Sequence, residues 1–139
     1  MAFDSGSPAD RRALERLRTD MIGWVTTVTP EGQPQTMPIW FLWDGATALI
    51  YSDRRAKRNV NVRANPRVTF HLNDDGRGGD VVVIEGEAHI DEATPGLPDN
   101  AAYVEKYRAW LVDGFNTPEE MAEIYNVPLR IAPVRGRAF

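Results

Sequence analysis

Residues 54–63 place five cations and no acid within ten positions, although the chain of 139 residues has a formal net charge of -4. The surrounding pattern predicts that this cationic segment follows a strand over residues 48–52 and runs into a short helix that ends at Ala64. Unpaired amide N–H groups and the helix dipole favour an anion at such a helix start. The segment therefore indicates a phosphate site, although charge alone equally fits a solvated basic helix face.

The other polar residues suggest little further chemistry. The chain has no Cys, which excludes disulfides, thiolate metal sites and Cys nucleophiles. His71 and His89 lie on different predicted strands, and without a placed carboxylate they are weak evidence for a metal. The acidic balance gives no broad basic surface for nucleic acid. We therefore expect no catalytic side chain and no metal, and we expect a bound cofactor to carry any chemistry.

Length and termini predict a small cytoplasmic protein. At 139 residues we expect one domain over residues 1–139, with residues 1–6 as a loose tail. No apolar run approaches the roughly 18 residues of a membrane span. Residues 1–10 lack a charged-then-apolar signal pattern, so a cytoplasmic location is the default expectation.

The elements that must position the cationic segment follow from hydrophobic periodicity. Ser7 and Pro8 predict the start of an amphipathic helix, and Thr117 and Pro118 predict the start of a short one. A further helix is predicted over residues 100–112. Alternating β-branched and aromatic residues predict six strands, over residues 24–28, 35–43, 48–52, 68–72, 81–90 and 128–135. Short turns between the early strands predict an antiparallel meander that closes into a barrel, with the helices at its periphery.

The second predicted strand, residues 35–43, is apolar on both faces. Both sides should therefore be covered. The barrel interior covers one side, which leaves a ligand or a second subunit for the other. Pro38 predicts an edge position or an interrupted ladder. A well-buried central strand with one irregularity is the alternative.

Three segments together resemble one family. Residues 23–45, with Thr26-Thr27-Val28, Gly32-Gln33-Pro34 and Pro38 to Gly45, look like the opening hairpin of the split β-barrel flavin and deazaflavin oxidoreductases. This is the pyridoxamine 5'-phosphate oxidase-like superfamily. Residues 51–68 are similar to its third strand and phosphate-binding helix, and residues 130–137 resemble its closing strand. The branch most similar is the short actinobacterial one that uses the deazaflavin coenzyme F420, family B of these oxidoreductases.

The resemblance implies a mainly β, six-stranded split barrel of the FMN-binding type, which forms a homodimer with cofactor sites at the subunit interface. The position that the family usually fills with Lys holds Arg58 here, with Lys57 one place earlier, so both are named as candidates. The chain is short, and the substrate-binding residues of pyridoxamine-phosphate oxidase itself are not found in it. The implied cofactor-binding residues are Met37, Pro38, Ile39 and Trp40 beside the ring, and Tyr51, Ser52, Arg55, Lys57 and Arg58 at the phosphate.

The implied function is an F420-dependent oxidoreductase that transfers a hydride between the deazaflavin and a small conjugated substrate. The surplus of cations would suit the acidic oligoglutamate tail of F420, which favours F420 over FMN. An FMN-dependent oxidase or reductase of the same fold, and a cofactor-binding protein without turnover, are the alternatives.

Overall fold

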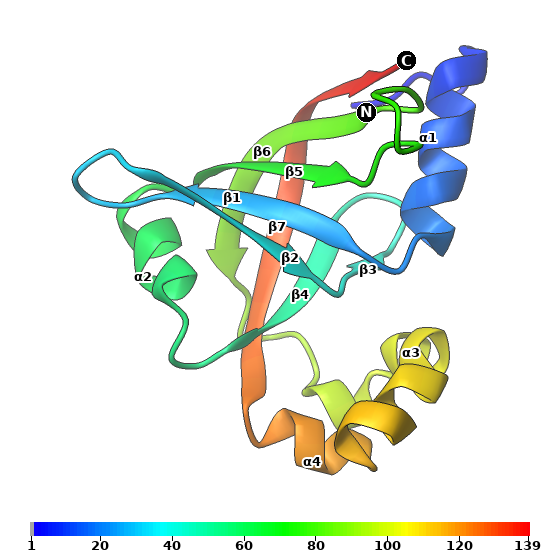
Figure 1. The fold of residues 1–139 in the computed structure, drawn as a ribbon. Helices are drawn as coiled ribbons and strands as arrows, with labels where there is room; N and C mark the ends of the chain where they lie inside the picture. The colour runs from blue at the N-terminus through cyan, green and yellow to red at the C-terminus, as the bar shows by residue number, and fades with distance from the viewer. Residues whose placement is uncertain (1) are drawn as a thin grey trace.

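The computed structural model describes residues 2–139 and contains one antiparallel sheet, curled into a half-barrel, with helices around it (Figure 1). The mainly β fold with peripheral helices is therefore confirmed. The strands are β1 (Gly23–Val28), β2 (Pro34–Ile39), β3 (Leu42–Trp43), β4 (Ala48–Asp53), β5 (Arg67–Leu72), β6 (Val82–Ile90) and β7 (Tyr125–Ala138). The α-helices are α1 (Pro8–Thr19), α2 (Lys57–Ala64), α3 (Ala101–Phe115) and α4 (Pro118–Ala122), and a 3₁₀ turn spans Leu97–Asp99.

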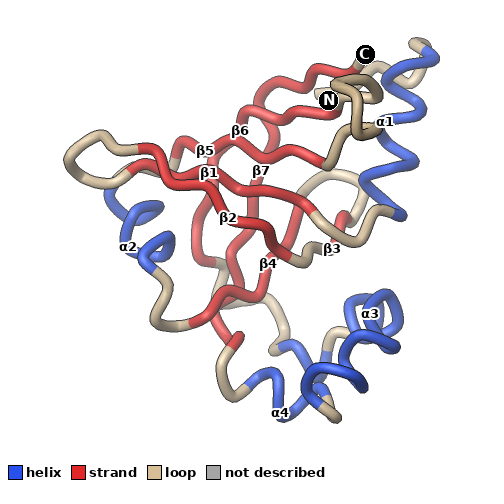
Figure 2. Tube along the Cα trace, in the orientation of Figure 1, coloured by secondary structure: helices blue, strands red, loops and turns tan. Residues whose placement is uncertain are grey.

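The sheet order is β2-β1-β5-β6-β7-β4-β3, so the prediction of a simple meander is wrong. β4 pairs with the last strand, β7, and not with the earlier hairpin. Helix α2 then carries the chain from β4 to β5, which pairs with β1 (Figure 2). Because β2 and β3 are consecutive in the chain but lie at opposite ends of this order, the sheet must curl to bring its two edges near each other.

The predicted second strand is broken into β2 and β3, which raises the strand count from six to seven. The break falls at Trp40 and Phe41, between the ends of β2 and β3. β2 is an edge strand, as Pro38 predicted. Its residues 34–38 are exposed in the single chain, and Met37 is 54% exposed. The expected cover on this strand therefore does not come from the chain itself.

Local capping signals placed the helix starts correctly. The side chain of Ser7 accepts a hydrogen bond from the Asp10 N–H at the start of α1, and Thr117 accepts one from the Glu120 N–H at the start of α4. The helix after β4 begins at Lys57, so Arg54 and Arg55 precede it and lie in the turn. It has no side-chain cap.

Strand β4 separates two hydrophobic cores. Ala48 and Ile50 join the core inside the half-barrel, whereas Leu49 and Tyr51 join a second core with α3, α4 and the 3₁₀ turn. All residues of β4 up to Ser52 are buried. β4 is thus the strand that is covered on both faces, and it carries groups from the barrel side to the helical side.

The expected loose tail over residues 1–6 is not found at Phe3, which is 2% exposed. Its ring occupies the space beside Gly136, where a Cβ would approach it to 2.6 Å. The two ends of the described chain lie near each other beside α1 (Figure 1). Met1 lies outside the described residues. Within residues 2–139, no helix is long and apolar enough to cross a membrane.

Candidate cofactor site

A cavity of about 270 Å³ lies between β2, β4, the start of α2 and the α3–α4 helices. Six of the nine candidate cofactor residues line it: Met37, Pro38, Ile39, Trp40, Tyr51 and Arg58. The other lining residues are Ile50, Tyr103, Phe115, Met121 and Tyr125. The sequence therefore identified one side of a real cavity. The volume lies just below the roughly 300–1,000 Å³ of ordinary small-molecule pockets, so the cavity by itself suits a compact group.

Among the described residues, Arg58 is the only positively charged one that lines this cavity. Its Nε donates a hydrogen bond of 2.9 Å to the Oγ of Ser52, which is fully buried at the end of β4. Burial lowers the pKa of Arg58 from its ordinary value. Within residues 2–139, no carboxylate lies within ion-pair distance of its guanidinium. A partly buried cation with no carboxylate within ion-pair distance is suited to bind an anion.

The remaining cations of residues 54–63 lie outside the cavity. Arg55 is exposed and contacts Asp53 at 3.4 Å, from Nε to Oδ1. Arg54 donates a 2.7 Å hydrogen bond to the carbonyl oxygen of Glu123. Lys57 is exposed. The structure thus brings Ser52 and Arg58 together and leaves Arg55 and Lys57 on the surface beside them.

The hydroxyl of Tyr51 is used within the fold. It donates a 2.7 Å hydrogen bond to the carbonyl oxygen of Pro95 and accepts one of 3.0 Å from the Nδ2 of Asn100. These bonds tie β4 to the segment before α3. Tyr51 therefore offers its ring to the cavity, and its hydroxyl is already engaged.

Contacts from α3 hold Trp40 in place at the break between β2 and β3. The Trp40 ring stacks on Tyr107 at 4.7 Å between centroids. The hydroxyl of Tyr107 accepts a 2.8 Å hydrogen bond from the Phe41 N–H, and it lies 2.7 Å from the Met21 carbonyl oxygen, to which it donates. The Nζ of Lys106 donates to the Phe41 carbonyl oxygen at 2.8 Å and lies 3.9 Å from the centre of the Phe41 ring. These contacts satisfy the backbone groups that the broken strand leaves free.

The helical wall of the cavity was missed from the sequence. Tyr103 and Phe115 come from α3 and Met121 from α4. Tyr103 contacts Tyr51 edge-on, with centroids 5.0 Å apart. The density of aromatic residues in α3 was visible in the sequence, but nothing in it showed that they would face β2 and β4.

The two histidines do not meet. His71 on β5 lies opposite Val83, and His89 on β6 lies opposite Arg130. His71 instead stacks on Trp24, with ring centroids 6.2 Å apart. Among the described residues, no cluster of three or more His, Asp or Glu side chains could hold a metal ion.

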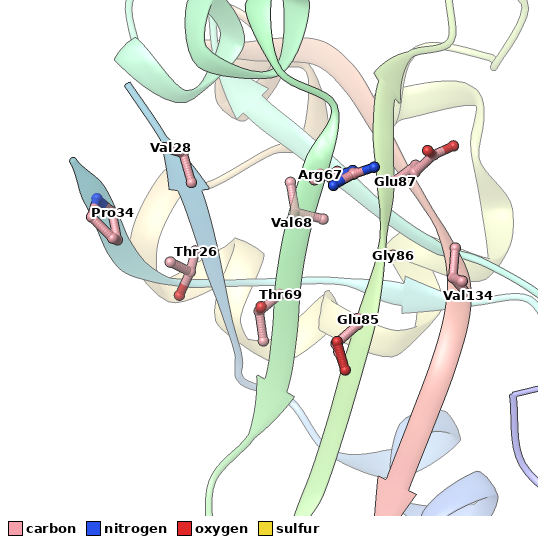
Figure 3. Close-up of a pocket in the computed structure, with 10 residues that line it drawn as sticks. All are labelled: Thr26, Val28, Pro34, Arg67, Val68, Thr69, Glu85, Gly86, Glu87 and Val134. Carbon is pink, nitrogen blue, oxygen red and sulfur yellow. The ribbon is translucent and has the colours of Figure 1, made fainter. Parts of the chain in front are cut away.

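A second hollow, of about 570 Å³, lies on the outer face of the sheet over β1, β5, β6 and β7. Figure 3 shows its lining, with Val28, Pro34 and Val134 at its apolar margins and with Arg67 and Glu87 on the neighbouring strands β5 and β6. Val134 is 72% exposed. The hollow continues onto β2, because Thr26 lines it and its hydroxyl is hydrogen-bonded to that of Thr36 at 2.7 Å.

Comparison with known proteins identifies the family to which this fold belongs. The profile of the family described as "Pyridoxamine 5'-phosphate oxidase" matches residues 9–138. No match was found among curated proteins.

Many solved structures share the fold. A conserved hypothetical protein from Mycobacterium tuberculosis is 25% identical, with 96% of this chain and 84% of that chain covered and a TM-score of 0.73. An F420 reductase is 24% identical, with 88% and 94% covered and a TM-score of 0.66. A heme storage protein from Vibrio cholerae is 14% identical, with 90% and 91% covered and a TM-score of 0.62. The last two likenesses show the fold alone.

Proposed function

Because the chain belongs to the pyridoxamine 5'-phosphate oxidase family, we propose that it is an F420-dependent oxidoreductase acting on a small conjugated substrate. The observation that carries this proposal is the pairing of Arg58 with Ser52 at one end of a cavity whose other wall is β2. A phosphate would bind at the paired end, and the deazaflavin ring would lie along residues 37–40.

The residues present fit such a cofactor. Arg58 is desolvated and free of carboxylates within the described chain, and its planar guanidinium can bind two phosphate oxygens at once. Helix α2 begins at Lys57 without a side-chain cap, which leaves the amide groups of Lys57 and Arg58 available to an anion, whereas that of Asn59 donates to the Ala56 carbonyl oxygen. Met37 and Trp40 offer flat or adaptable apolar surface to a ring.

The position of the surface cations favours F420 over FMN. A cavity of about 270 Å³ cannot enclose a fused ring system together with a long acidic tail. The tail would have to lie across the exposed face near Arg55 and Lys57. FMN ends at its phosphate and would leave these cations unused. The surface cations would attract the acidic tail at long range, so added salt should weaken the binding of F420 more than the binding of FMN.

The cofactor would supply the hydride chemistry, and the chain would supply position and a dry environment. Arg58 and Ser52 would hold the phosphate, and Trp40, fixed by Tyr107, would set the height of the ring above β2. Phe115 and Met121 would exclude water from the far side. No acid or base among the lining residues is assigned to proton transfer.

Parallel titrations with F420 and FMN test the cofactor. We expect saturable quenching of the protein's tryptophan fluorescence by F420, with FMN binding at least tenfold more weakly at low salt, because only F420 reaches the outer cations. Raising the salt concentration should narrow this difference. A preference for FMN would assign the protein to the flavin alternative. Binding of neither cofactor would contradict the proposal.

A turnover assay separates the enzyme from a binding protein. Reduced F420 is mixed with a panel of enones and quinones, and its oxidation is followed by absorbance. Turnover of any member beyond the rate without protein supports the oxidoreductase. Tight F420 binding with no turnover across the panel would favour the alternative of a cofactor-binding protein.

We also propose that two copies associate through β2 and the outer sheet hollow, so that each cofactor site is closed by the partner. Val134 is 72% exposed in the outer hollow and Met37 is 54% exposed on the edge strand β2, so both are apolar side chains that a second copy could cover. A two-fold interface contains each residue twice, so one substitution places two added charges in the interface.

We expect the protein to sediment as a dimer and Val134→Glu to sediment as a monomer. Val112→Glu is the control, because Val112 is 60% exposed on α3 and should leave the dimer intact. A monomeric parent protein, or equal effects of the two variants, would contradict this interface.

A further inference from the structure

Among the described polar residues that line the cavity, Tyr103 is the least exposed. The residue is 1% exposed and lines the cavity from α3, opposite β2. Its ring packs against Tyr51 and Tyr107, each with centroids 5.0 Å away. Within residues 2–139, no hydrogen-bond partner of its hydroxyl is found. A buried hydroxyl without a partner is uncommon, because it loses its bonds to water on folding.

This hydroxyl is not sealed inside the protein. In the described chain, the one fully enclosed side-chain oxygen or nitrogen without a partner is Asn59 Oδ1. The Tyr103 hydroxyl therefore keeps some accessible surface, and the cavity is the space that Tyr103 lines. Its free O–H is a hydrogen-bond donor available to whatever enters there.

The other two tyrosines of the cavity differ in this respect. The hydroxyl of Tyr51 is already bonded to Pro95 and Asn100. Tyr125 is only partly buried, so water can satisfy its hydroxyl. Tyr103 is thus the cavity tyrosine whose hydroxyl has neither a protein partner in the described residues nor ready access to bulk water.

We propose that the Tyr103 hydroxyl binds an acceptor oxygen of the substrate, which is an uncharged, planar, conjugated carbonyl compound of the quinone or enone class. This inference rests on the proposed function: the cofactor ring would lie along the exposed edge of β2 at the mouth of the cavity, and the substrate would lie inside the cavity. The aromatic rings of Trp40, Tyr103 and Phe115 suit a flat molecule. No carboxylate lines the cavity, and its one cation, Arg58, is assigned to the cofactor phosphate.

We expect the Tyr103 hydroxyl to stay protonated and to act as a hydrogen-bond donor. Burial raises the pKa of its hydroxyl above the ordinary value, and the nearby hydroxyls of Tyr107 and Tyr51 act in the same direction. The phenolate is therefore disfavoured, and the O–H remains in place to bind a carbonyl oxygen. When negative charge develops on that oxygen during reduction, the same hydrogen bond becomes stronger.

Two ligands that differ only in the carbonyl groups test this role. The full chain is titrated by calorimetry with 1,4-naphthoquinone and with naphthalene, with and without saturating oxidised F420. In Tyr103→Phe, which keeps the ring, we expect about a tenfold loss of naphthoquinone affinity and no change for naphthalene. The matched variant Tyr125→Phe should change neither affinity by more than about twofold.

The outcomes are distinct. An equal loss for both ligands, no loss for naphthoquinone, or an equal effect of Tyr125→Phe would overturn the assignment to Tyr103. Failure of naphthoquinone to bind the parent protein would overturn the substrate class. Failure of F420 to bind would remove the proposed cofactor instead, and the titrations without F420 would still measure the Tyr103 hydrogen bond. A thermal melt of Tyr103→Phe within a few degrees of the parent shows that the variant is folded.

Discussion

Replacing Arg58 by Met is expected to weaken F420 binding by about 100-fold, with little loss of thermal stability. Arg58 is the partly buried cation at the cavity, and it would form a hydrogen-bonded charge pair with the cofactor phosphate. Removing one partner of a buried pair of this kind costs about 2–5 kcal/mol. A factor of 100 corresponds to about 2.7 kcal/mol. Within the described chain no carboxylate lies within ion-pair distance of Arg58, so the Met variant breaks no salt bridge. The buried Ser52 hydroxyl loses its 2.9 Å bond from Arg58 and keeps the 3.5 Å bond to the Asp53 carbonyl oxygen, so the stability lost should be about 1 kcal/mol. Fluorescence titration gives the affinity, and a thermal melt checks the fold.

Lys57→Met is the matched control for Arg58→Met. Lys57 is exposed and lies outside the cavity lining, and exposed charge pairs contribute about 0.2–1 kcal/mol. Loss of the Lys57 charge should weaken F420 binding by about fivefold or less, and high salt should remove this difference in affinity between the variant and the parent protein. The double variant should show the loss of Arg58→Met together with a reduced salt dependence. A larger effect at Lys57 than at Arg58 would assign the phosphate to the other cation, and unchanged affinity in the double variant would remove the phosphate site.

Features of the fold that depend on residues close together in the sequence could be predicted, whereas those that depend on distant residues could not. Ser7 and Thr117 cap helices through bonds to residues three positions away, so their neighbourhood in the sequence is sufficient. The break at Trp40 and Phe41 depends on Lys106 and Tyr107, which lie 65 and 66 positions from Phe41. The sequence at the break is a continuous apolar run, which is the pattern of an unbroken strand covered on both faces. A partner so distant in the chain leaves no mark in that pattern, which explains why six strands were predicted and seven were found.

The same distinction separates the two walls of the cavity. Residues 37–40 and Arg58 were predicted because they lie in segments whose spacing resembles a family. Tyr103 and Met121 reach the cavity only because β4 is buried on both faces and so accepts a second core on its outer side. Sequence patterns identify that a helix has an apolar face. They do not identify which strand the face will cover, and the helical wall of the cavity was therefore missing from the prediction.

Tyr51 illustrates a correct position with a different chemical role. Its place at the end of the predicted strand, beside Ser52, suggested a phosphate ligand. In the structure its ring lines the cavity, while its hydroxyl bonds to Pro95 and Asn100. The side chain therefore links β4 to the segment before α3. Ser52 and Arg58 remain as the pair that we propose for the phosphate.

Gly86→Ala is expected to lower the free energy of unfolding by about 3 kcal/mol, and the melting temperature by about 10 °C. Gly86 lies at the register shift where β6 pairs with β7. A Cβ at this position would lie 2.6 Å from the carbonyl oxygen of Ala132 and 3.2 Å from its carbonyl carbon. Both are backbone atoms, so no side-chain rotation relieves the contact and the two strands must separate. β6 and β7 form the centre of the sheet, so this strain acts on the whole barrel.

Gly114→Ala is the matched control for Gly86→Ala, because it adds the same methyl group where nothing lies within 4 Å. Gly114 belongs to α3, where Ala is favoured over Gly by up to about 1 kcal/mol, so this variant should melt slightly higher than the parent. Denaturant unfolding of the two variants in parallel gives both values. If Gly86→Ala melts with the parent, the strands at the bulge can separate without cost. The outer hollow over β6 and β7 would then be a deformable surface and a poor template for a second copy of the chain.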